Sequence, residues 1–309
     1  MTRAIRFALA TALLWLGASQ QAAVSAPASA AKASTANAAP SYVVTTTTDL
    51  KDIVRAIGGN RVEVDSLALP AQDPHTLELK PAHLARLEKA DLVVRIGLDH
   101  EPWLAKMHTR ALVVNLSQHV RLLQTDTPRL RAEARAHVHL FGNPHYWLDP
   151  ENIPPMSLAI MQALSTLRPA DQGYFEANQA AFLSKLKLRM KEWQLAMAPY
   201  AGTKVVVMHD SWAYFADRYQ LAIVASAEPS PGIPPSPAEL AALFARMRAS
   251  SVRLVIANPD SNSALVEQVA QHGHARAVTL VPSVGADADA NSYFSLIDLN
   301  ISRLAKALR

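Results

Sequence analysis

Three histidines lie at positions where they could bind a metal ion together. His75 stands in the segment LPAQDPHTLELKP, His145 in GNPHYWLDP and His209 in KVVVMHDSWAYF. Each comes after an aliphatic run that predicts a strand, and open α/β sheets bind ligands at the carboxyl ends of their strands. Imidazoles that meet at such an edge suit a metal ion of borderline softness. The sequence therefore predicts a metal site formed by His75, His145 and His209.

The residues around these histidines support the prediction. An Asp-Pro pair precedes His75 and an Asn-Pro pair precedes His145, and both pairs restrict the backbone just before the imidazole. A single loop histidine is more often a turn or cap residue than a ligand, so the argument rests on all three together. His209 and Asp210 also form a His-Asp pair of the kind found in metal-dependent phosphohydrolases. Such an enzyme needs further Asp/His pairs, which the sequence does not place well.

The remaining histidines carry weaker signals. His137 and His139 would share one face of a strand, and we interpret them, in their Arg-rich segment, as an auxiliary metal-capture site. His272 and His274 lie at the end of a predicted helix, where a cation interacts favourably with the helix dipole. We expect the other four to be surface residues: His83, His100, His108 and His119.

Alternating strand and helix patterns predict an α/β fold. Short aliphatic runs separated by helices are typical of parallel sheets that are buried on both faces. The predicted strands fall into two groups of four, at residues 42–46, 62–67, 92–96 and 112–116, and at 205–208, 221–225, 254–257 and 278–281. The predicted helices between them include residues 49–57, 81–89, 236–249 and 263–271, and a last helix covers residues 292–308.

A long helix separates the two groups of strands. Apolar residues recur at helical spacing between Phe175 and Met197, and no Pro or Gly interrupts residues 174–198. A helix over residues 170–198 would be about 40 Å long at 1.5 Å per residue. We therefore predict two lobes, each with a four-stranded parallel sheet flanked by helices, joined by one long helix with a cleft between the lobes.

The N-terminus has the features of an export signal. Arg3 and Arg6 precede an apolar run over residues 7–16 and a stretch of small residues. The run is shorter than the roughly 20 residues that a membrane-spanning helix needs. We predict a signal peptide over residues 1–26 and a flexible leader over 27–40. An N-terminal metal-binding lobe, a linking helix and a C-terminal metal-binding lobe follow, at residues 41–168, 169–199 and 200–309.

Composition excludes several classes of function. The chain has 309 residues, of which 30 are Lys or Arg, 26 are Asp or Glu and none is Cys. Three of the bases and no acid lie in residues 1–40, which leaves 27 bases against 26 acids, so nothing resembles a nucleic-acid footprint. The lack of Cys excludes disulfides, iron–sulfur clusters, thiolate zinc sites and a lipid-modified N-terminal Cys. We expect a soluble, exported protein without a lipid anchor.

The motifs in this order resemble a known family. With LPAQDPHTLELKP, KADLVVRIGLDHEPWL, NPHYWLDP and HDSWAYFADRY, the chain is similar to the solute-binding proteins of zinc and manganese ABC importers. The resemblance implies two lobes on a rigid helix and one transition-metal ion between them, delivered to a membrane permease. It assigns the ligands to His75, His145 and His209. Manganese-type members often have Glu at the last of these positions, so an all-imidazole set favours Zn²⁺ over Mn²⁺.

The chain departs from the family at the expected fourth ligand. Many members have an Asp just after the last strand. In this chain the equivalent position is either Val281 or Pro282, and neither can bind a metal through its side chain. The fourth ligand is then water, Asp287, Asp289 or Glu228. Glu228 follows the sixth predicted strand and should face the cleft. The family's long His/Asp-rich loop before NPH is also missing.

The predicted function is binding without chemistry. We expect a periplasmic high-affinity zinc-binding protein, not an enzyme, that captures Zn²⁺ between its lobes and delivers it to an ABC permease. One alternative is an importer component for manganese or iron. Another is an exported zinc-dependent hydrolase, for which Glu228 would be the general base beside a zinc-bound water.

Overall fold

The structure, a computed structural model, describes residues 39–72, 74–107, 109–124, 142–228 and 234–309. The predicted signal peptide and nearly all of the predicted leader lie outside these residues, as do His108, His137 and His139. Within the described residues, no helix has both the length and the apolar character needed to cross a membrane.

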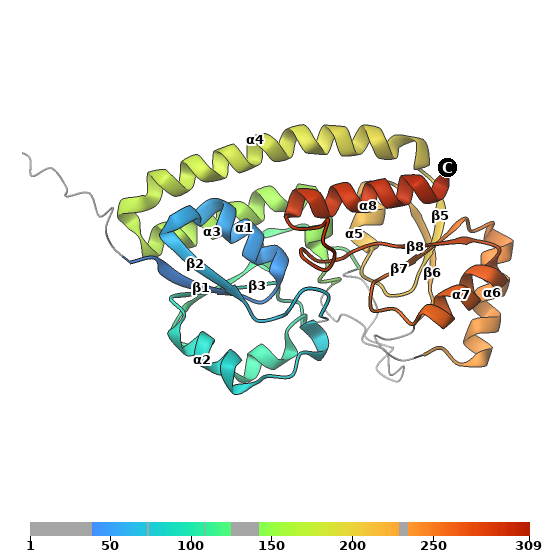
Figure 1. The fold of residues 1–309 in the computed structure, drawn as a ribbon, viewed down its shortest axis with the longest axis horizontal. Coiled ribbons are helices and arrows are strands. Elements are labelled where there is room, and N and C mark those ends of the chain that lie inside the picture. Colours follow the sequence, from blue (N-terminus) through green and yellow to red (C-terminus); the bar gives the residue numbers. More distant parts are fainter. Residues whose placement is uncertain (1–38, 73, 108, 125–141, 229–233) are drawn as a thin grey trace, which may run out of the picture. The chain divides into compact units, whose positions relative to one another are not determined.

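Two four-stranded parallel sheets form the framework (Figure 1). The first has the order β2-β1-β3-β4 and is built from β1 Ser41–Thr45, β2 Val62–Ser66, β3 Leu92–Arg95 and β4 Leu112–Asn115. The second has the order β6-β5-β7-β8 and is built from β5 Lys204–Val207, β6 Ala222–Ser226, β7 Leu254–Ala257 and β8 Arg276–Thr279. All eight predicted strands are present within two residues of their expected bounds, and the predicted fold class is confirmed. We call the part around β1–β4 the N-terminal lobe and the part around β5–β8 the C-terminal lobe.

The central strands fix the register of each sheet. Val43 in β1 pairs with Val64 of β2 and Leu92 of β3, and Val205 in β5 pairs with Ile223 of β6 and Leu254 of β7. Because all pairs are parallel, the carboxyl ends of the four strands in a lobe lie at the same edge of its sheet.

Helices cover these sheets. They are α1 Thr48–Gly58, α2 Pro81–Lys89, α3 Ile153–Leu167, α4 Gln172–Met197, α5 Ala213–Arg218, α6 Pro237–Ser250, α7 Ser263–Gly273 and α8 Tyr293–Leu308. Sequence patterns did not predict α3 or α5. The first turn of α3 contains Pro154 and Pro155, which suggest a loop but are tolerated there because the first helical N–H groups need no partner within the helix. Helix α5 is too short for a clear period.

The long helix α4 packs along both lobes, as predicted. It contacts α1 and α3 of the N-terminal lobe and α8 of the C-terminal lobe. Phe182 and Trp193 on its buried side both contact the ring of Phe294 in α8. One apolar core includes Val43 of β1, Val205 of β5 and these α4 residues, so the core is continuous from one sheet to the other.

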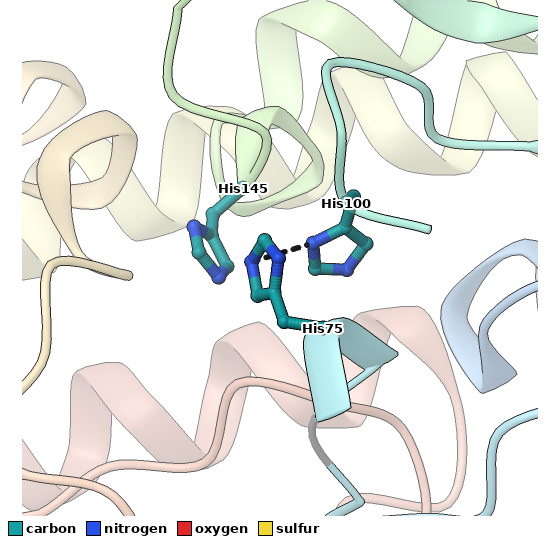
Figure 2. A group of neighbouring side chains, drawn as sticks. All are labelled: His75, His100 and His145. Carbon is teal, nitrogen blue, oxygen red and sulfur yellow. Dashed lines mark hydrogen bonds between the residues drawn. The ribbon is translucent and has the colours of Figure 1, made fainter. Parts of the chain in front are cut away.

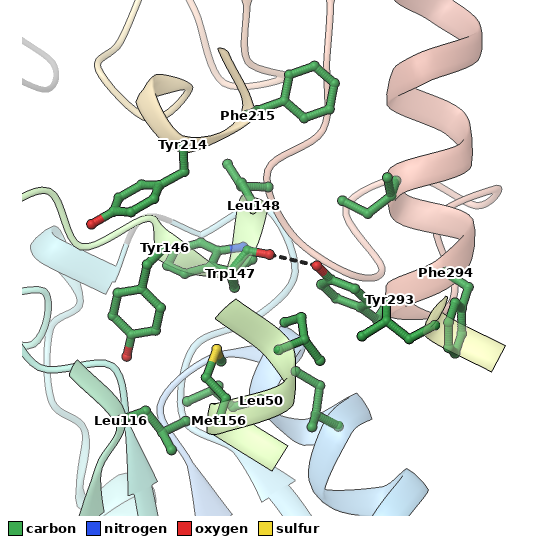
Figure 3. Packing of buried hydrophobic residues seen from close by; sticks show 14 of the residues in the cluster. Leu50, Leu116, Tyr146, Trp147, Leu148, Met156, Tyr214, Phe215, Tyr293 and Phe294 are labelled. Atoms are coloured by element: carbon green, nitrogen blue, oxygen red, sulfur yellow. Dashed lines mark hydrogen bonds between the residues drawn. The ribbon is translucent and has the colours of Figure 1, made fainter. Parts of the chain in front are cut away.

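Hydrogen bonds also join the lobes directly. The indole N–H of Trp147 donates to Pro282 O at 2.9 Å. The Tyr293 hydroxyl donates to Trp147 O at 2.8 Å, as Figure 3 shows. At the start of α1, Asp49 accepts from the Val284 N–H at 2.9 Å and Asp52 accepts from the Tyr293 N–H at 2.8 Å. The segment between β8 and α8 is therefore held against the N-terminal lobe.

Candidate metal centre

Three histidines of the N-terminal lobe meet beside the interface between the lobes (Figure 2). His75, His100 and His145 each offer a ring nitrogen, and these nitrogens all lie within 4.8 Å of one another. The closest pair is His100 Nδ1 and His75 Nε2, at 3.1 Å. The ring centroids of His100 and His145 are 5.4 Å apart. This spacing suits three ligands that converge on one ion.

The C-terminal lobe places His209 next to this group, beside His145. Its ring centroid lies 5.7 Å from that of His145. His209 comes shortly after β5, as predicted, and is half-buried. A cavity of about 420 Å³ is lined by His100, His145 and His209, together with Trp147 and Glu228. Two of the histidines predicted from the sequence, His75 and His145, therefore lie in one group with His100, and the third, His209, lies beside His145.

His75 is positioned by a short turn after β2. It lies in the 3₁₀ helix Pro74–Thr76, which follows the strand by several residues. The indole N–H of Trp103 donates to Pro74 O at 2.8 Å and so ties this turn to the loop after β3. The turn Pro74–Thr76 thus reaches the edge of the sheet where His100 also lies.

Asn143 fixes the orientation of His145. Its Oδ1 accepts from the His145 backbone N–H at 3.0 Å and lies 2.9 Å from His145 Nδ1. Asn143 Nδ2 donates to Asp210 O at 2.8 Å, which settles the orientation of the amide. Because Oδ1 can only accept, His145 Nδ1 carries the proton and Nε2 is left as the ligand atom. The Tyr214 hydroxyl donates to Asn143 O at 2.9 Å and holds this segment from α5.

The structure corrects the interpretation of His100 as a surface residue. Its exposed fraction is 1%, and it lies in the loop after β3 that Glu101 organises. The Glu101 carboxylate accepts from Ile96 N at 2.7 Å, Gly97 N at 2.9 Å and Thr46 Oγ1 at 2.5 Å. Burial raises the pKa of Glu101, although these hydrogen bonds act in the opposite direction. The polar pair HE after a buried strand was the signal, because the rule that selected the other histidines applies to it equally.

The candidate carboxylates differ in where they lie. Glu228 follows β6, is half-buried and lines the histidine cavity. Asp287 instead forms an ion pair with Arg303 at 2.5 Å and accepts from the Asp289 N–H at 3.0 Å, and both contacts lower its pKa. Neither Asp287 nor Asp289 is among the described residues that line that cavity. Only Glu228 therefore remains beside the histidines as a carboxylate from the predicted set.

The other predicted positions show no part in the cluster. Val281 is fully buried, and its backbone N–H and carbonyl both pair with Asn300 at 2.7 Å. His272 and His274 lie at the end of α7, as predicted, and both are exposed. His272 stacks on Phe244, with ring centroids 4.8 Å apart.

The arrangement is suited to hold a cation through nitrogen. Neutral imidazoles bind zinc well, whereas magnesium, calcium and manganese are better served by carboxylate and carbonyl oxygens. Three imidazoles that line one cavity, with His75 beside two of them, therefore make a donor set for a borderline ion.

Comparison with known proteins places these features in a family. The model of the family described as zinc-uptake complex component A, periplasmic (ZnuA), matches residues 43–307. The high-affinity zinc uptake protein ZnuA of Yersinia pestis is 26% identical, over 84% of this chain and 89% of that protein. The manganese ABC transporter substrate-binding lipoprotein PsaA of Streptococcus pneumoniae is 23% identical, over 86% of this chain and 88% of that protein.

Solved structures share the fold. A crystal structure of ZnuA aligns with a TM-score of 0.75 and 27% identity, over 87% of this chain and all of that one. A zinc-bound ZnuA deletion mutant aligns with a TM-score of 0.74 and 29% identity, over 87% of this chain and 98% of that one.

Proposed function

Because the chain belongs to the family of the periplasmic component A of zinc-uptake complexes, we propose that it binds one Zn²⁺ and delivers it to an ABC permease. The family consists of substrate-binding components of metal importers. The chain is therefore a binding protein and not an enzyme, and the alternative of an exported hydrolase has no support.

The observation that carries the proposal is the meeting of imidazoles from two lobes. We assign His75, His145 and His209 as zinc ligands, with Zn–N bonds of about 2.0–2.1 Å. His145 is already held with Nε2 as its ligand atom, because Asn143 accepts from Nδ1. Of the carboxylates that the sequence suggests for the fourth position, Glu228 lines the same cavity.

Zinc is favoured over manganese by the type of donor. Relatives include both zinc and manganese importer components, so the family alone does not choose between the two ions. Imidazole nitrogens favour zinc, whereas manganese prefers oxygen ligands. A competition titration in which excess Mn²⁺ displaced Zn²⁺ from the purified protein would reverse this assignment.

Binding should change loops more than the relation of the lobes. The continuous core along α4 and the hydrogen bond from Trp147 to Pro282 both resist a wide opening. Ligation by His209 therefore needs movement of the loop after β5 and little rotation of a lobe. Crystals with and without zinc that differed by a large lobe rotation would contradict this mechanism.

Export to the periplasm through residues 1–26 completes the proposal. The family is periplasmic and the N-terminus has the pattern of a signal peptide. We expect the protein to be a monomer. We also expect it to dock on a membrane permease, because the metal must pass from the protein into a transport channel. Fractionation that left the protein in the cytoplasm would contradict this localisation.

A zinc titration against a chelator of known affinity tests the proposal. We expect one zinc per chain, and much weaker binding in the variants His75→Ala, His145→Ala and His209→Ala. His272→Ala is the matched control, because His272 is an exposed histidine remote from the cluster in sequence and structure. Imidazoles bind metal only when neutral and have an ordinary pKa of about 6.5, so affinity should fall in more acidic buffer. Binding that no cluster variant weakens would remove the proposal.

A further inference from the structure

We infer that His100 is the fourth zinc ligand, through Nδ1, so that four imidazoles hold the ion. The inference rests on the proposed function and names a residue that the sequence patterns assigned to the surface. It replaces both Glu228 and water in the fourth position.

The distances support ligation by His100. In a tetrahedral site with Zn–N bonds of about 2.0–2.1 Å, two ligand nitrogens are about 3.3 Å apart. His100 Nδ1 and His75 Nε2 are 3.1 Å apart, which is close to that edge length. The ligand nitrogen offered by His145 lies within 4.8 Å of both, so a small contraction of the group suffices.

The His75–His100 contact also defines a proton rearrangement. Without metal, one of the two facing nitrogens carries the proton and the other accepts it. Zinc needs a lone pair on both nitrogens, so the proton between them must leave. When both rings are neutral, this proton moves to the other nitrogen of the ring that carries it, so both rings stay neutral. If His100 is the donor, zinc binding converts it from the Nδ1–H to the Nε2–H tautomer.

His100 is more deeply buried than Glu228. It is 1% exposed, and the neighbouring Glu101 accepts three hydrogen bonds that fold the loop onto the ends of β1 and β3. Glu228 is half-buried, and as a ligand it would add a carboxylate to an otherwise neutral donor set.

The C-terminal lobe offers no side-chain ligand just after its last strand, β8, at Val281 and Pro282. Val281 is fully buried and apolar, and Pro282 has no side-chain donor. Because His100 supplies a neutral nitrogen where Glu228 would supply an anionic oxygen, we expect His100 to increase selectivity for zinc over manganese.

X-ray absorption at the zinc edge tests the inference on the unaltered protein. Multiple scattering from the rings should fit four imidazoles and no oxygen in the first shell. A fit to three imidazoles and one oxygen would overturn the inference and leave the proposed function intact. Failure of the protein to bind zinc at all would instead overturn the proposed function.

Substitutions of His100 show whether it binds zinc itself or only positions His75. We expect His100→Ala to bind zinc about 100-fold or more weakly and to show three imidazoles, because loss of an outer hydrogen-bond partner alone typically costs 10- to 100-fold. His100→Asp should gain affinity for Mn²⁺ relative to His100→Ala. His272→Ala should match the parent protein. If His100→Gln, which can still hydrogen-bond to His75, restored parent affinity, His100 would be a positioning residue and not a ligand.

Nitrogen NMR of the parent protein covers the case in which His100 variants do not fold. Selective ¹⁵N labelling of histidine should show four rings whose shifts change on zinc addition. One of them should bind through Nδ1. Three shifted rings, all bound through Nε2, would contradict the inference.

Discussion

The two lobes have the same strand order but present different side chains to the cavity. In each lobe the second strand of the chain order lies at one edge, the first and third strands are central and the fourth lies at the other edge. The loops after the second strands carry His75 in one lobe and Glu228 in the other. The loops after the third strands carry His100 and Asn258.

His100 and Asn258 lie at equivalent places in the two lobes, in the loop after the third strand, but their side chains have different roles. Asn258 accepts from the Trp212 indole N–H at 2.8 Å and donates to Ser211 Oγ at 3.1 Å, so its side chain braces its own lobe. In the loop of His100, the bracing is done by Glu101 and the imidazole points to the cluster. We infer that the N-terminal lobe captures the ion and that His209 of the C-terminal lobe completes the site.

The largest expected effect comes from comparing one ligand of each lobe. A four-ligand zinc site contributes roughly 10–16 kcal/mol, or about 3–4 kcal/mol per ligand, so losing one ligand weakens binding by about 100- to 1,000-fold. We expect the loss of zinc affinity to be about 1,000-fold for His145→Ala and about 100-fold for His209→Ala. The smaller loss follows because the N-terminal lobe keeps three imidazoles in His209→Ala. Chelator competition measures both affinities. A larger loss for His209→Ala would break the proposed division between the lobes.

A smaller effect should follow from removing the partner of a ligand. Asn143→Ala leaves His145 Nδ1 without its acceptor, and we expect zinc affinity to fall by about 10- to 100-fold. Asn143→Asp keeps an acceptor and serves as the matched variant, with a smaller loss. Equal losses in the two variants would show that Asn143 acts on folding and not on the orientation of His145.

The contact of Asp49 with the C-terminal lobe should make stability depend on pH. Burial raises the pKa of Asp49 to about 7, above its ordinary value in the unfolded chain. The folded state therefore binds the proton more tightly, and this contribution to stability is full below about pH 4 and is lost as the pH rises through about 7. Asp49→Asn can still accept from the Val284 N–H but does not titrate.

Thermal melting of the zinc-free protein tests this effect. We expect Asp49→Asn to gain melting temperature relative to the parent at about pH 8 and to lose that advantage at about pH 5. The histidines titrate in both proteins, so their effect cancels in the difference between the two melting temperatures. An advantage that did not change with pH would show that Asp49 is not the titrating group.

The smallest expected effect concerns a single hydrogen bond between the lobes. Trp147→Phe removes the donor to Pro282 O and keeps most of the aromatic packing. A hydrogen bond of this kind contributes about 1 kcal/mol, so the melting temperature should fall by a few degrees. Tyr293→Phe, which loses the hydroxyl bonded to Trp147 O, is the matched variant. A fall of zinc affinity similar to that of His145→Ala would show that Trp147 is part of the site.

Much of the fold follows from local patterns in the sequence. The eight strands are buried aliphatic runs, and Phe175, Phe182 and Trp193 mark the buried side of α4 at helical spacing. Helix α3 was missed because its first residues include two prolines, whose effect depends on their place in the helix.

The site was predicted in part, because ligation depends on contacts between distant residues. His75, His145 and His209 follow strands in an order that topology brings together. His100 also follows a strand, yet its burial depends on Glu101 receiving hydrogen bonds from Thr46 and the backbone, which no spacing reveals. The role of Asp287 was equally hidden, since its ion pair with Arg303 forms only in the folded lobe.

Diffraction from zinc-loaded crystals at the zinc absorption edge tests the central claim most directly. We predict one anomalous peak per chain, with ring nitrogens of His75, His145 and His209 at about 2.0–2.1 Å from it. A peak bound elsewhere, or a zinc ion held by residues of one lobe with His209 turned away, would contradict the account.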